Sequence, residues 1–180
     1  VIGTTGLQGR HENLMSECSR MAPIFHSPNM SVVVAILNEM VKDVAGILGG
    51  DEFDVEILEE HHKKKKDAPS GTALMLGKTI AEARKRTFSE VARFDRFNDV
   101  AQPRVEGEIG FAALRGGSTV GMHEVSFNGV FEKLTLRHDA CDVGIFADGA
   151  LRIARWLKDK KMPPGIYTMH DYLQSFMSKL

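Results

Sequence analysis

Three strand-like runs that follow one another directly constrain the fold more than any other feature of the sequence. They cover about residues 106–114, 119–127 and 131–138, with Gly116-Gly117 and Asn128-Gly129 at the joins. Asn-Gly between two such runs is a strong signal for a tight β-hairpin. The sequence therefore predicts a strand meander, which must form part of a sheet.

The residues before this meander favour a mixture of helix and strand. Residues 54–60 alternate between apolar and polar side chains, which is typical of a strand with one buried face. Helices are expected at about 32–48 and 71–86, with Ser31 and Ser70 as their caps. The pattern predicts an α+β domain with a mixed open sheet, covered by helices on one face and free to pair on the other.

The two ends of the chain are less regular. At 180 residues the chain is long enough for one domain plus part of another. It does not begin with Met, and Val1-Ile2 runs into a tight Gly-Thr-Thr-Gly loop like the end of a buried strand, so we expect further residues upstream. Other expected elements are a short helix at 14–21, a strand at 24–26, a polar loop at 87–103, and a last helix at 145–158 followed by a turn at 163–165 that leads to the tail.

Composition excludes some classes of function. The formal net charge of −1 gives no overall field that favours nucleic acid or an anionic membrane, so neither is expected as a partner. No stretch approaches the roughly 20 apolar residues of a membrane helix. Cys18 and Cys141 are far apart and suit a reducing cytoplasm, although a single disulfide stays open.

The segment 59–72 carries the candidate chemistry, because it leaves a strand and arrives at the start of a helix. It holds two histidines, which exchange protons near neutral pH, and four lysines, which pair with carboxylates. The amides that begin a helix form an anion site. Together these groups predict a pocket for a small dianionic acid. A solvated lysine loop before an ordinary Ser-Gly-Thr cap remains the structural alternative.

Two other ligands are considered for the same loop. Adjacent histidines can bind zinc, but no cysteine, third histidine or HExxH spacing accompanies them, so no metal is expected. A nucleic-acid binder could use the basic run, yet no aromatic platform lies beside it.

The stretch 61–73 resembles the signature HHxxKxDAPSGTA of the dihydrodipicolinate reductase family and fits it at every fixed position. Residues 3–6, 27–31, 121–125 and 146–151 resemble other segments of that family in the same order. The similarity extends from residue 1 to about residue 170.

This resemblance implies reduction of the small dicarboxylate 4-hydroxy-tetrahydrodipicolinate, in lysine biosynthesis, by NADPH or NADH. His61 is then the general acid/base and Lys65 the proton donor. His62, Gly71 and Thr72 hold the substrate carboxylates.

The resemblance also implies a cofactor site and a domain plan. The backbone at Gly3, Thr4 and Thr5 is then expected to approach the nicotinamide, although this loop, read without the resemblance, is only a turn. The cleft at the hinge between domains is expected to be lined by Ser27, Pro28, Asn29 and Met30. Residues 1–28 are expected to be a remnant of a Rossmann-type α/β nucleotide-binding domain, 29–144 the substrate and oligomerisation domain, and 145–180 a helix and tail that return to the first. A homotetramer is expected.

The sequence also departs from the family pattern. The glycine-rich loop that cradles a pyrophosphate is absent, so residues 1–180 are expected to bind nucleotide poorly. Val143 stands where an arginine is expected, and Asp148 where a basic residue is expected. With its partner surface missing, the last helix is expected to be loosely held or covered by another subunit. A non-catalytic assembly module is therefore the second functional hypothesis.

Overall fold

The computed structural model describes residues 1–96 and 102–177, and the chain divides into two compact units. Unit 1 comprises Val1–Ile36 and Val143–Leu180, and unit 2 comprises Leu37–Asp142. The domain limits expected from the sequence remain a prediction. No helix in the described ranges is both long enough and apolar enough to cross a membrane.

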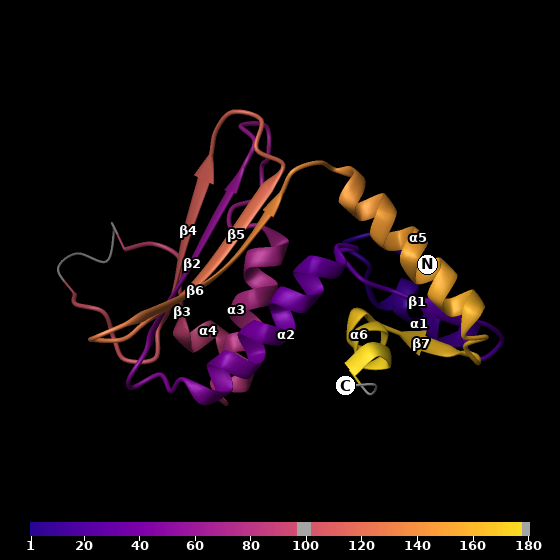
Figure 1. Ribbon diagram of the computed structural model, residues 1–180, viewed down its shortest axis with the longest axis horizontal. Coiled ribbons are helices and arrows are strands. Elements are labelled where there is room, and N and C mark those ends of the chain that lie inside the picture. The colour runs from indigo at the N-terminus through magenta and orange to yellow at the C-terminus, as the bar shows by residue number, and fades with distance from the viewer. Residues whose placement is uncertain (97–101, 178–180) are drawn as a thin grey trace. The chain divides into compact units, whose positions relative to one another are not determined.

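Unit 2 is built on a five-stranded mixed sheet (Figure 1). In spatial order its strands are β3 (Ala92–Arg93), β4 (Ile109–Arg115), β2 (Asp54–His61), β5 (Gly121–Asn128) and β6 (Lys133–Ala140). The first three run parallel, whereas β2, β5 and β6 pair antiparallel. The predicted α+β fold is confirmed, and so is the hairpin, since Asn128 pairs with Lys133 across the turn.

Helices cover one face of this sheet. They are α3 (Gly71–Ala83), the short α4 (Phe88–Val91) and the part of α2 (Val32–Ile47) that belongs to unit 2. Alternate residues of β2 point into the resulting core, as the sequence predicted, because every second position from Val55 onward is buried. The predicted caps are confirmed: Ser31 and Ser70 accept hydrogen bonds from Val34 and Ala73.

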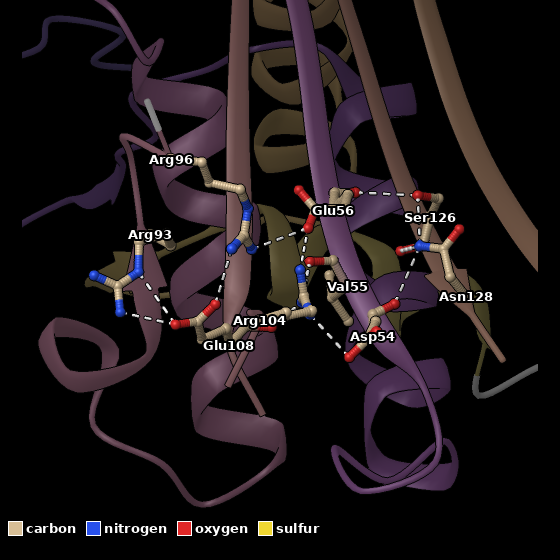
Figure 2. A network of polar contacts seen from close by, with 9 residues as sticks. All are labelled: Asp54, Val55, Glu56, Arg93, Arg96, Arg104, Glu108, Ser126 and Asn128. Atoms are coloured by element: carbon tan, nitrogen blue, oxygen red, sulfur yellow. Dashed lines mark hydrogen bonds and ion pairs between the residues drawn. The ribbon is translucent and has the colours of Figure 1, made fainter. Parts of the chain in front are cut away.

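On the other face, an ion-pair network lies near the start of β2 (Figure 2). We call it the amino-end cluster; it comprises Asp54, Glu56, Arg93, Arg96, Arg104 and Glu108. Arg104 bonds Glu56 and donates to the carbonyl oxygen of Val55 at 2.8 Å. Gly110 makes room for this network, because a Cβ there would overlap the Glu56 carboxylate.

Unit 1 contains α1 (Gly9–Cys18), β1 (Pro23–Phe25), α5 (Gly144–Asp159), β7 (Gly165–Tyr167) and α6 (Met169–Met177). β1 and β7 pair in parallel, and Ile2 forms a parallel bridge with His26. A second apolar core holds this unit together; its buried members are Phe25, Met30, Ile153, Trp156, Met169, Tyr172 and Leu173.

Several sequence predictions were wrong in position or extent. The first helix spans Gly9–Cys18 rather than 14–21, because a reciprocal cap between Gln8 and His11 sets its start. None of its residues is buried, so no apolar face marks its position in the sequence. Helix α3 ends at Ala83, three residues early. The expected loop at 87–103 includes α4 and β3, while its residues 97–101 lie outside the described ranges.

The expectation that the last helix lacks a partner surface in this chain was also wrong, while its cover by another subunit remains a prediction. In α5, Ile153 is fully buried and Trp156 is 7% exposed. Their partners include residues of α6, which the sequence did not predict, and the Trp156 indole donates to Ser175 at 3.1 Å. The tail therefore supplies the apolar surface that the helix was thought to lack.

Candidate active site

Side chains from three strands meet at the carboxyl end of β2, on the face that the helices cover. In the parallel pairing with β4, His61 lies opposite Arg115. In the antiparallel pairing with β5, Glu59 lies opposite His123. Because residues paired across strands share a face, all four side chains point toward the start of α3. We call these four residues the carboxyl-end cluster.

Glu59 is the buried centre of this cluster. Its side chain is 1% exposed, and Arg115 binds it in a two-point ion pair with N–O distances of 2.6 and 2.8 Å. The backbone amide of Ser70 donates to the same carboxylate at 3.1 Å. Burial opposes ionisation, but hydrogen bonds from Arg115 and His61 outweigh it and hold the pKa of Glu59 below its ordinary value. The carboxylate is therefore charged at neutral pH.

His61 donates from Nδ1 to this carboxylate at 2.5 Å. Burial lowers the pKa of His61 from its ordinary value, the charges of Lys65 and Arg115 add to the effect, and Glu59 opposes it. The imidazole is therefore neutral at pH 7 and retains a lone pair on one nitrogen, as a general base requires.

His123 and Ser70 extend the polar contacts beneath His61. The two imidazole rings meet edge to face with centroids 5.1 Å apart. A hydrogen bond of 2.9 Å joins His123 Nε2 to Ser70 Oγ, which also accepts from the Ala73 amide. Burial, together with the charge of His61, lowers the pKa of His123 to about 4. His123 is thus a neutral support at physiological pH.

Lys65 differs from the other lysines of its run. Its side chain is 22% exposed and its Nζ lies 2.9 Å from Asp67, whereas Lys63, Lys64 and Lys66 are exposed. The chain turns back at His62, whose carbonyl oxygen accepts from the Lys65 amide. Lys65 lies close enough to His61 to lower the pKa of that imidazole. The structure therefore brings His61 and Lys65 together, as the sequence predicted.

The first residues of α3 lie at the same end of the sheet. Gly71 is exposed, and a Cβ built there would meet nothing within 4 Å, so a ligand can reach its backbone. Thr72 follows it, half-buried. The amides of a first helical turn favour anions. Imidazole, ammonium and helix amides at one place can bind a carboxylate and move a proton.

The residues expected at a cofactor lie in unit 1, on two neighbouring loops. The Ser27 amide donates to the Ile2 carbonyl oxygen at 3.1 Å, and Ile2 pairs in parallel with His26, so both loops leave the same edge of that pairing. Ligands of α/β proteins bind at such carboxyl edges. The first loop is exposed at Gly3, Thr4 and Thr5. In the second loop Pro28 is exposed, Asn29 is half-buried, and Ser27 and Met30 are buried.

Sequence reasoning missed Glu59, Arg115 and His123 as site residues, and placed Ser70 at the helix start without its contacts to Glu59 and His123. One signal for Glu59 was present: in the alternation of β2 it takes a position on the buried face, the same face as Val55 and Ile57. A carboxylate at such a position needs a charged partner. Asp148, which departs from the family pattern, pairs with Arg152 one turn along α5, and Val143 is 65% exposed just before that helix.

In the described ranges, no group of three or more His, Cys, Asp or Glu side chains is placed to hold a metal ion.

Comparison with known proteins identifies the family. A family model described as dihydrodipicolinate reductase, C-terminus, matches residues 33–173. The chain is 45% identical to the 4-hydroxy-tetrahydrodipicolinate reductase of Rickettsia rickettsii (strain Sheila Smith), over 95% of this chain and 67% of that protein. It is 43% identical to the enzyme of the same name from Geotalea uraniireducens (strain Rf4), over 96% of this chain and 63% of that protein. It thus spans about two thirds of the length of these relatives.

A solved structure agrees with this assignment at the level of the fold. It is the dipicolinate-bound dihydrodipicolinate reductase from Paenisporosarcina sp. TG-14, with a TM-score of 0.70 and 22% identity over 93% of this chain and 62% of that one. The family model covers most of the chain, and both curated relatives exceed 40% identity. The chain therefore belongs to the dihydrodipicolinate reductase family.

Proposed function

We propose that this protein reduces 4-hydroxy-tetrahydrodipicolinate to tetrahydrodipicolinate with NADPH or NADH, in the diaminopimelate route to lysine. The name shared by relatives that match over 95% of the chain supports this reaction. The observation that carries it is the convergence of His61, Lys65 and the exposed start of α3 at one end of β2. That set of groups suits a cyclic compound with two carboxylates.

Each group has a distinct task in this proposal. The nicotinamide, when bound, supplies the hydride, and the hydroxyl of the substrate leaves as water. Lys65 donates a proton to the substrate. His61 acts as the general acid/base, which exchanges a proton with the substrate. The helix amides at Gly71 and Thr72 hold one carboxylate, with His62 as a further contact.

Two parts of the proposal rest on unit 1 and on assembly. The exposed Gly3–Thr5 backbone fits a flat ring lying against it, because no side chain of Gly3 intervenes and the adjacent loop at Ser27–Met30 leaves the same edge. Either nicotinamide cofactor remains compatible with these contacts. A homotetramer in the cytoplasm is proposed by analogy with the family.

A second candidate function is an assembly module without catalysis. The turn between β5 and β6 supports it, because Val130 is 88% exposed and Phe131 is 98% exposed. Adjacent apolar side chains exposed to this degree favour burial against another chain. Under this hypothesis the protein associates but does not turn over substrate.

The test is NADPH oxidation with the product of the preceding synthase, using protein translated from the complete reading frame. We expect His61→Ala and Lys65→Ala each to lower kcat by about 100-fold or more. Lys64→Ala, which removes a neighbouring exposed lysine, should retain the wild-type rate. Full rates in the first two variants would refute the roles assigned to them. Association without any turnover in the wild type favours the assembly module.

A further inference from the structure

Glu59 has no task in the proposed reaction, yet four donors converge on it. Arg115 Nη1 and the His61 ring donate to Oε2, and Arg115 Nη2 and the Ser70 amide donate to Oε1. They come from β4, from β2 itself and from the residue that caps α3. A structural tie between strands needs only the arginine, so the bond to His61 calls for a separate explanation.

We infer that Glu59 is a positioning residue that fixes the tautomer and ring orientation of His61. This inference rests on the proposed function, since it assigns a purpose to the His61 imidazole. An ionised carboxylate only accepts hydrogen bonds, so Nδ1 must carry the hydrogen that it donates to Glu59. The lone pair of the neutral ring is then on Nε2, which becomes the atom that exchanges protons with the substrate.

The surroundings of Nε2 agree with this assignment. On β5, a Cβ built at Gly121 would lie 3.0 Å from His61 Nε2. Any larger residue at position 121 would crowd the nitrogen that the tautomer leaves available. Nδ1, in contrast, faces a buried carboxylate that no substrate can replace.

Arg115 makes the arrangement possible by keeping Glu59 ionised. It binds both carboxylate oxygens and also donates to the Asp67 carbonyl oxygen at 2.6 Å, in the loop that leads to α3. Without this cation, burial would favour a protonated carboxyl, which could donate to Nδ1 and reverse the tautomer. Glu59 and Arg115 therefore act on His61 as one unit.

The first test observes His61 directly in the 180-residue chain. Nitrogen-15 NMR reports the tautomer and the pKa of each histidine. In wild-type protein the neutral His61 ring should carry its proton on Nδ1. In Glu59→Gln the amide oxygen should face Arg115 and the Ser70 amide, so its NH2 group faces Nδ1 and the proton should move to Nε2. The pKa of His61 should fall, because the charge that favours imidazolium is lost.

The matched control is Glu60→Gln, which removes the same charge one residue away. Glu60 accepts from Thr119 Oγ1 at 2.8 Å, and its side chain points to the opposite face of β2 from that of His61. This variant should leave the tautomer and pKa of His61 unchanged. An Nε2–H tautomer in the wild type, or the same spectrum in Glu59→Gln, would overturn the inference.

The second test separates positioning from stability. Glu59→Gln strands the Arg115 cation and can weaken folding, so the double variant Glu59→Gln/Arg115→Met is compared with it. Removing both charges should restore stability but not the tautomer. In the full enzyme, kcat should stay about 100-fold below wild type in the double variant, with KM nearly unchanged.

Recovery of kcat together with folding would show that the pair is only structural. If His61→Ala loses no activity while the NMR result holds, the proposed function fails but Glu59 still orients His61. The two hypotheses are thus separated by their readouts.

Discussion

The two ends of β2 use the same kinds of side chain for different purposes. In the amino-end cluster, arginines neutralise two half-exposed carboxylates, Asp54 at 51% and Glu56 at 43%, together with the buried Glu108 (Figure 2). In the carboxyl-end cluster, one arginine neutralises a carboxylate that is 1% exposed, and the carboxylate is shared with an imidazole and a helix cap. Ion pairs alone tie segments together; an ion pair that also holds a titratable ring can support chemistry.

The largest predicted difference is in stability. Arg115→Met leaves the buried Glu59 charge unpaired and should lower the free energy of unfolding by about 3–5 kcal/mol. Urea denaturation followed by circular dichroism measures this change. A loss below about 1 kcal/mol would mean that water solvates Glu59 once Arg115 is removed. The two clusters would then not differ in the cost of an unpaired carboxylate.

A second prediction concerns pH. His123 has its pKa lowered from 6.5 to about 4 by burial, so the unfolded chain binds a proton at higher pH than the folded chain. Stability from this group is complete above pH 6.5 and is lost as the pH falls toward 4, by about 3 kcal/mol in total. Denaturation at a series of pH values should show that slope, and His123→Gln should flatten it.

The amino-end cluster provides the comparison for that experiment. It contains no histidine, so Arg104→Met should shift the stability curve without changing its slope in the same pH window. An unchanged slope in His123→Gln would mean that other groups carry the acid sensitivity.

A third, smaller effect is expected from Arg104→Met itself. Its partners Asp54 and Glu56 are 51% and 43% exposed, so water can solvate them when the cation is removed. The loss should be about 1–2 kcal/mol, most of it from the backbone carbonyl groups that Arg104 also contacts. Urea denaturation of Arg104→Met and Arg115→Met side by side tests whether Arg115→Met loses more stability. A loss in Arg104→Met that equals or exceeds the loss in Arg115→Met would contradict this prediction.

Local patterns in the sequence were sufficient for much of unit 2. The alternation in β2, the Asn128-Gly129 hairpin and the Ser70 cap depend on neighbouring residues, and the structure contains all three. The pairing of Glu59 with Arg115 joins residues 56 positions apart, through a parallel register between β2 and β4 that no local pattern specifies. The sequence could indicate that Glu59 needs a partner but could not identify it.

Unit 1 was harder to predict for a related reason. Its strands β1 and β7 have three residues each, too few for an alternating pattern, and they pair across most of the chain length. Helix α6 becomes part of a core through tertiary contacts, among them the buried Ile153 and Trp156 of α5. All three elements depend on tertiary contacts rather than on local preference.

The smallest expected effect on folding is that of Gly71→Ala. Because open space surrounds this position, the added methyl should change stability by less than about 0.5 kcal/mol. Under the proposed function, affinity for a ring dicarboxylate, with dipicolinate as the probe, should nevertheless fall about tenfold, since the methyl obstructs approach to the helix amides. Calorimetric titration measures the affinity of Gly71→Ala and of a control variant, Gly46→Ala. Gly46, in α2, is a suitable control because it also has open space around it.

The most direct test of the site is an NMR titration of the 180-residue chain with dipicolinate. The proposed site predicts that the amides of Gly71 and Thr72 and the ring of His61 shift together along one binding curve, while the residues of the amino-end cluster do not move. Saturable binding that leaves these three groups unperturbed, or that shifts the amino-end cluster instead, would contradict the assignment of the carboxyl end of β2 as the active site.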